Sequence, residues 1–202
     1  MKNNKLQICG LALALAVFAI PATSTAASEG WYGRFEGGVA VTPNTSKNGS
    51  KLTYNSAGWD IGGALGYKYG PMRYEGEVAY QNTGYKSLNG VSNKSRTSVV
   101  DVMGNVYYDF DQINDTFVPY LGVGIGYAHL SNGVNVNNGT TTSNTDNRFA
   151  YQGIVGFNIN LTENVAANID YRYFGTSNAK NFSGNIFQNN IFNAGLTYYF
   201  GN

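Results

Sequence analysis

Cysteine, charge and long apolar runs are all scarce in this sequence. The only cysteine among 202 residues is Cys9, so the chain beyond it has no disulfide framework and no thiol chemistry. Charged residues make up 12% of the chain, against about 25% in ordinary soluble domains. No segment after residue 27 reaches the about 18 consecutive apolar residues that a membrane-spanning helix needs. A disulfide-stapled domain and a helical membrane protein are therefore excluded.

Aromatic residues and glycine are abundant by contrast, at 14% and 26 of 202 residues. Few charges, many aromatics and no long apolar run are typical of a membrane β-barrel, in which apolar residues occupy alternate positions. If Lys2 and Lys5 are set aside, 11 of the 13 basic residues remain against 12 acidic ones. This balance gives no reason to expect nucleic-acid binding.

The first 27 residues have the pattern of a secretory signal peptide. A basic start precedes the small and apolar run 10–20, and small residues at 22–27 suit a cleavage site. The apolar run is too short to span a membrane, and Cys9 precedes it in a poor context for lipid attachment. We therefore predict a cleaved signal peptide at 1–27, with cleavage after Ala26 or Ala27, and one mature domain at 28–202.

Apolar and polar residues alternate with a period of two in eight segments, which predicts eight antiparallel strands. Most span about 10 to 14 residues, a length that suits a tilted membrane strand better than a soluble one. The prediction is an all-β fold, an up-and-down transmembrane β-barrel, with strands near 31–42, 57–70, 72–82, 97–110, 117–130, 148–161, 165–174 and 190–200.

The connections alternate between short turns and long polar loops. Short turns fall at 70–71, 111–116 and 162–164, so both termini are expected on the short-turn side, which is periplasmic in outer-membrane barrels. The long loops are rich in Asn, Ser, Thr, Gly and Lys and are predicted near 43–56, 83–96, 131–147 and 175–189.

Aromatic residues mark both ends of the apolar strand faces and flank aliphatic middles, as expected for two membrane–water interfaces. A soluble barrel with an inward apolar face has no need of two such girdles. The girdle near the short turns comprises Trp31, Tyr69, Tyr108, Phe110, Phe117, Tyr198 and Phe200. The girdle near the long loops comprises Trp59, Tyr80, Tyr127, Phe149, Tyr151, Tyr171, Tyr173 and Phe192.

The opposite, polar faces carry charges of both signs and many glycines, as the crowded interior of an eight-stranded barrel requires. Buried charges persist when they are paired, so we predict an ion-pair network in the lumen. A register slip by one residue would turn these charges toward lipid. The predicted network comprises Arg34, Glu36, Asp60, Lys68, Arg73, Glu75, Glu77, Asp101, Asp170 and Arg172.

The two ends of the predicted barrel differ in charge. Acidic residues, Asp109 among them, gather near the short turns. A basic extracellular rim is predicted at the long loops, where it would contact lipopolysaccharide phosphates or anionic host molecules; ordinary solubilising charge is the alternative. The rim comprises Lys47, Lys51, Lys86, Lys94, Arg96, Arg148 and Lys180.

The sequence resembles the eight-stranded outer-membrane barrel families, namely opacity-type surface proteins and the membrane domain of OmpA-like proteins. Residues 117–127 (FVPYLGVGIGY) are similar to the fifth strand of such barrels, and residues 191–200 (IFNAGLTYYF) to their aromatic-ended last strand. The resemblance implies a Gram-negative surface antigen, with lipid and lipopolysaccharide as its surroundings. It also implies that the barrel-assembly machinery recognises the last strand, which ends at Phe200.

Candidate chemistry is sparse. His129, the only histidine, is in phase with lipid-facing Tyr127, which favours a girdle position. Ser131 lies two residues further on, but that spacing is expected by chance in so polar a loop, so it gives little support to catalysis. One histidine and no later cysteine predict no metal, haem or other cofactor. Glu75 and Glu77 share a strand face, as an acid–base pair would, but neighbouring arginines favour ion pairing.

These patterns predict a non-enzymatic outer-membrane surface protein that serves the envelope and acts like an adhesin through its loops. A small channel through the charged lumen is the alternative. An adhesin role rests on the resemblance, because a fold does not establish a function.

Overall fold

Ten antiparallel strands make up the computed structural model, which describes residues 28–42, 45–47, 50–53, 57–88, 91–111, 116–135, 141–177 and 187–201. The predicted signal peptide lies outside the described residues. No helix among the described residues has the length and apolarity to cross a membrane. The strands are β1 (Gly30–Val41), β2 (Thr45–Lys47), β3 (Ser50–Thr53), β4 (Gly58–Tyr69), β5 (Met72–Leu88), β6 (Val91–Asp109), β7 (Phe117–Asn135), β8 (Thr141–Asn160), β9 (Val165–Thr176) and β10 (Gln188–Tyr199).

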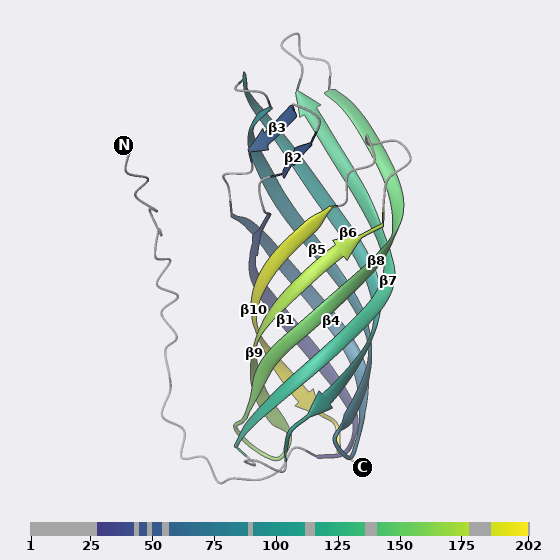
Figure 1. Cartoon of the computed structure of the whole chain (residues 1–202). Helices are drawn as coiled ribbons and strands as arrows, with labels where there is room; N and C mark the ends of the chain where they lie inside the picture. The colour runs from purple at the N-terminus through teal and green to yellow at the C-terminus, as the bar shows by residue number, and fades with distance from the viewer. Residues whose placement is uncertain are drawn as a thin grey trace, which may run out of the picture.

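Eight of these strands close into a barrel (Figure 1). Each pairs with its neighbours in chain order, from β4 through to β10, and β1 joins β4 on one side and β10 on the other. Closure pairs the backbone groups of every barrel strand and leaves no free edge, which is the condition for a sheet to cross lipid. The predicted fold class is confirmed.

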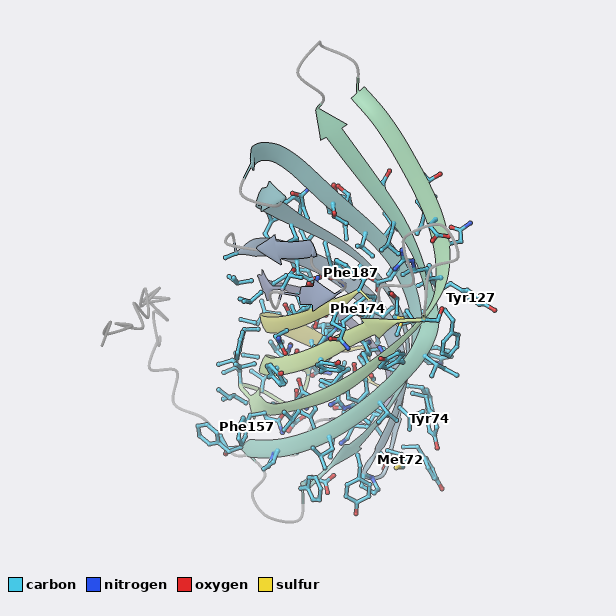
Figure 2. All side chains as sticks on the ribbon, turned by 45° about the horizontal axis from the view of Figure 1, so that its top comes forward. Met72, Tyr74, Tyr127, Phe157, Phe174 and Phe187 are labelled. Carbon is cyan, nitrogen blue, oxygen red and sulfur yellow. The ribbon has the colours of Figure 1, made fainter. Side chains whose placement is uncertain are left out.

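Alternate side chains point to opposite faces of the barrel wall. Figure 2 shows Tyr74, Tyr127 and Phe157 on the outside, whereas Phe174 and Phe187 lie inside. Of the outward side chains, Val123 is 67% and Tyr127 72% exposed. A wall with so much apolar surface needs an apolar surrounding, because it could not be hydrated without large cost. The inward–outward assignment made from the sequence is therefore correct.

The short turns and both ends of the barrel sequence meet at one end (Figure 1). Gly70 has φ of +53°, a left-handed conformation that turns β4 into β5 without a steric penalty. Its N–H donates to Glu29 Oε1 at 2.9 Å, which ties the turn to the start of β1. Thr162 Oγ1 similarly accepts from the backbone N–H groups of Asn164 and Val165.

The opposite rim is uneven, because four adjacent strands are much longer than the rest. β5 to β8 contain 17 to 20 residues, whereas β1, β4, β9 and β10 contain 12. Most of the loops predicted at 83–96 and 131–147 are therefore paired strand, and β2 and β3 lie within the loop predicted at 43–56. The alternation of apolar and polar residues does not extend into these parts, because strand segments beyond the membrane do not contact lipid and need no apolar face.

Candidate functional site

The lumen at the short-turn end holds one carboxylate between two cations. Arg73 Nε donates to Asp109 Oδ1 and Oδ2 at 3.0 and 2.9 Å, and Lys68 Nζ lies 3.1 Å from Oδ2. The Arg73 guanidinium also lies 4.6 and 4.8 Å from the ring centroids of Tyr107 and Tyr120. A guanidinium held by a carboxylate and two aromatic faces has little freedom to move.

Two arginines and three glutamates fill the middle of the lumen. Arg34 Nη2 donates to Glu75 Oε1 at 2.7 Å, and its Nε lies 3.5 Å from Glu36 Oε2. Arg172 forms ion pairs with both Glu36 and Glu77. The cluster crosses the lumen, because Arg34 and Glu36 belong to β1, the other glutamates to β5 and Arg172 to β9.

Neutral side chains complete the hydrogen bonds of these glutamates. The hydroxyls of Tyr32 and Tyr107 donate to Glu75 at 3.0 and 3.1 Å, and Asn105 Nδ2 donates to Glu77 Oε2 at 2.6 Å. Both glutamates are therefore engaged by cations and donors, which favours the ion-pair interpretation over an acid–base pair. The tyrosines were not among the predicted network residues, although Tyr107 lies in the inward phase of its strand.

Glycines make room for these large side chains. A Cβ on Gly66 would lie 2.3 Å from the Tyr32 ring, and one on Gly122 would lie 2.5 Å from the Tyr107 ring. The glycines on the inward faces thus explain how a narrow barrel holds tyrosines and arginines side by side. This is the crowding that the glycine-rich polar faces predict.

The arginines in the middle of the lumen are shielded from water. Arg34, Arg73 and Arg172 are 4, 0 and 2% exposed, and an open channel beside them would leave them accessible to water.

Among the described residues, ion pairs engage eight of the ten predicted network residues, all except Asp60 and Asp101. Asp109, which was not among the ten, joins both Lys68 and Arg73.

The lumen toward the long-strand rim is partly apolar, which was not predicted from the sequence. Toward the rim, apolar side chains stand on the inward faces beside buried polar ones such as Thr83, Thr97 and Asn189. The signal was present in the inward phase, where Val99 and Ile191 stand among polar residues. The buried cluster comprises Ala40, Val99, Met103, Ala128, Leu130, Ala150, Phe174, Phe187 and Ile191.

His129 lies on the outside of the barrel, as its phase with Tyr127 predicts. Its Nδ1 is 2.7 Å from Asn147 Oδ1 on the neighbouring strand. That contact gives the ring a cross-strand amide partner at the membrane boundary. No group of three or more His, Cys, Asp or Glu side chains able to hold a metal ion occurs within the described part of the chain.

The structure places six of the seven residues of the predicted basic rim. Arg148 is 6% exposed and turned into the barrel, where its Nε donates to Asp146 Oδ2 at 3.2 Å, so it does not contribute to an outward rim. Lys180 lies outside the described residues, as do the side chains of the other five. The backbone nevertheless places those five, which are Lys47 on β2, Lys51 on β3, Lys86 on β5, and Lys94 and Arg96 on β6.

A family model described as the outer membrane protein beta-barrel domain matches residues 10–200. The search of curated proteins found no match. The fold is similar to that of Neisserial surface protein A, with a TM-score of 0.59, 18% identity, and coverage of 86% of this chain and 99% of that one.

Two further solved structures share the fold. Outer membrane protein OprG from Pseudomonas aeruginosa has a TM-score of 0.58 and 15% identity, with coverage of 88% of this chain and 99% of that one. Ail, the attachment invasion locus protein of Yersinia pestis, was solved in complex with the heparin analogue sucrose octasulfate. Its TM-score is 0.53 and its identity 16%, with coverage of 84% of this chain and 99% of that one.

Proposed function

Because this chain belongs to the outer membrane protein beta-barrel family, whose members lie in the bacterial outer membrane, we propose that it is a non-enzymatic surface protein that binds polyanions. The barrel is a closed anchor in the envelope. The strands that project from it contact the phosphates of lipopolysaccharide or anionic molecules of a host surface, as an adhesin would.

One observation carries this proposal: five basic residues share one continuous projecting sheet. β2 pairs with β3, β3 with the end of β5, and β5 with the start of β6. Across β2, β3, 84–88 and 91–96 the sequence has five Lys or Arg and no Asp or Glu. Figure 1 shows β2 and β3 beside the long strands at the rim. A surface of one sign attracts polyanions and strengthens their binding at low salt.

The likeness to Ail supports this ligand class, since that protein was solved with a sulfated analogue of heparin. At 16% identity the likeness extends to the fold alone, so the charge of the sheet remains the main support. The proposal includes export by the signal peptide at 1–27, periplasmic termini, and recognition of the strand ending at Phe200 by the barrel-assembly machinery.

The test replaces all five basic residues of the sheet with glutamine and measures binding of the folded protein to heparin and to lipopolysaccharide vesicles. We expect at least a tenfold loss of affinity for one of these polyanions, because each basic residue near an anionic surface contributes about 1 kcal/mol. Glu163→Gln, at the opposite end, is the control and keeps full affinity.

The cellular arm compares adherence of intact bacteria to a panel of host-cell and matrix surfaces. Strains carry the wild type, the five-residue variant or a barrel with shortened loops, at equal levels of folded barrel verified by heat-shifted gel mobility. Loss of adherence to one surface identifies the host ligand class. Equal polyanion binding by the wild type and the five-residue variant would refute the proposal.

A further inference from the structure

The outer face of β5 and β6 carries no negative charge. The two strands have four acids, all of which point into the lumen and are buried, namely Glu75, Glu77, Asp101 and Asp109. Their basic residues other than buried Arg73 all lie in the part that projects beyond the membrane belt, namely Lys86, Lys94 and Arg96. An anionic group that approaches the top of this face therefore meets basic residues and no acid.

Lower down, the same face is apolar. Val78 on β5 and Val102 on β6 are register partners and are 54 and 57% exposed. Figure 2 shows Tyr74, further down β5, on the outside of the barrel as well. Outward side chains of this kind contact the acyl chains of the surrounding lipid.

Three hydrogen-bonded side chains lie between the apolar part and the basic residues. Asn82 and Ser98 are register partners on the outer face, and Tyr80 is in phase with Asn82. The Tyr80 hydroxyl and Asn82 Nδ2 both donate to Ser98 Oγ, at 3.0 and 3.1 Å. Because Ser98 Oγ accepts both bonds, its own hydrogen can be donated to an acceptor outside the protein. The Trp59 ring, 5.2 Å from the Tyr80 ring, borders this group.

The spacing along β6 brings all three levels within reach of one molecule. Arg96 and Lys94 lie two and four residues beyond Ser98, which is about 7 and 13 Å along an extended strand. Val102 lies four residues from Ser98 in the other direction, again about 13 Å. Apolar, hydrogen-bonding and basic groups thus follow one another in that order from the membrane outward.

We propose that this face binds lipopolysaccharide through its lipid A part. The acyl chains lie along Val78 and Val102, the sugar and amide groups bond to Ser98 and Asn82, and the phosphates lie at the basic residues above them. The inference rests on the proposed binding of polyanions and narrows it to one ligand. A host polysaccharide has no acyl chains and meets only the basic level, whereas an amphiphile in the outer leaflet meets all three.

The opposite wall of the barrel offers a matched comparison. On β9 and β10 the Tyr171 hydroxyl donates to Asn190 Oδ1 at 2.6 Å, and both side chains are again on the outer face. The only basic residue in these two strands is Arg172, which is buried in the lumen. Asn190 is thus an outward amide with a tyrosine partner on strands that carry no basic residues toward the rim.

The experiment titrates fluorescently labelled lipopolysaccharide, and separately heparin, into the folded barrel in detergent micelles. We expect the double variant Asn82→Leu/Ser98→Val to bind lipopolysaccharide at least fivefold more weakly and heparin as the wild type does, because every basic residue stays in place. Ser98→Val alone should weaken lipopolysaccharide binding at least twofold. Asn190→Leu, the matched control, should keep both affinities. The new side chains are apolar and face the lipid boundary, so the variants should fold, and heat-shifted gel mobility verifies this.

Equal lipopolysaccharide binding by the wild type and the double variant would overturn the proposal. A parallel loss of heparin binding in the double variant would also overturn it, because the face would then not select an amphiphile. So would an equal loss of lipopolysaccharide binding in Asn190→Leu. The glutamine variant of the five basic residues separates this failure from that of the proposed function, since unchanged binding of both ligands by that variant would refute polyanion binding itself.

Discussion

At the scale of single residues, several carboxylates in the lumen each bind more than one partner. Removal of Asp109 should cost the most stability, because it is the only ion-pair partner of Arg73 among the described residues and the nearer of two partners of Lys68. Removal of one side of a buried pair leaves a charge with no counterpart in a low-dielectric interior. The energetic weight of Asp109 should therefore exceed that of any surface acid.

Asp109→Asn should destabilise the folded barrel by about 3–5 kcal/mol, since it leaves Arg73 and Lys68 without their shared carboxylate. The measurement is equilibrium unfolding in urea of barrels refolded into lipid vesicles, followed by tryptophan fluorescence. Asp111→Asn is the matched control. Asp111 is 30% exposed and lies 3.6 Å from Lys68, so its loss should cost less than about 1 kcal/mol. Equal effects of the two changes would contradict the role of Asp109 as the shared counter-charge of Arg73 and Lys68.

Residue identity and strand phase predict which side chains face the lumen, but not how they pair. Strand phase assigns Arg34, Glu36 and Arg172 correctly, because lipid excludes charge from the outer face. Pairing depends on the barrel shear and on rotamers, which bring β1, β5 and β9 together across the axis. Arg148 was wrongly expected on the rim, because strand phase does not show whether an inward side chain near the barrel mouth is buried by its neighbours.

At the scale of elements, the lipid-facing stripe of each strand fixes its register. β7 shows this most clearly, with Phe117 and Tyr127 near the two interfaces and Val123 between them. A charge at Val123 would lie near the middle of the apolar belt, whereas one at Thr145 on β8 would lie beyond the aromatic girdle.

Val123→Arg should therefore destabilise the barrel by about 2–4 kcal/mol, while Thr145→Arg should cost no more than about 1 kcal/mol. Unfolding midpoints of the two variants in vesicles of the same lipid test this difference. A cost that is the same at both positions would mean that the belt does not lie where the aromatic residues place it.

Strands beyond the belt were not detected from the sequence, for a physical reason. In β5 to β8 the residues past the upper girdle are mostly Asn, Ser, Thr, Gly and Lys, which give no regular alternation of apolar and polar positions, and of these Asn, Gly and Lys are weak strand formers. Each of these segments continues a strand that is already paired in the barrel, so further backbone hydrogen bonds to the neighbouring strand form at little extra entropic cost. The projecting sheet is thus a consequence of the barrel, not of local preference.

At the scale of the whole molecule, the barrel with its filled lumen and the projecting sheet have different roles. A wall that satisfies all backbone groups in lipid needs no ligand for stability, which leaves the sheet free to vary in sequence. The same architecture would serve permeation only if the arginine layer opened. Arg34 and Arg172 are bonded to acids on other strands, so opening would break several buried pairs at once.

We therefore expect the wild-type barrel to be silent in planar bilayer recordings under an applied voltage. Replacement of Arg34, Glu77 and Arg172 together with alanine removes the side chains that cross the middle of the lumen, and it should produce discrete conductance steps. The triple variant must first show the heat-shifted mobility of a folded barrel. Steady conductance of the wild type, altered by Arg34→Ala alone, would favour a channel over an anchor, because it would show that the ion-pair layer admits ions while it is intact.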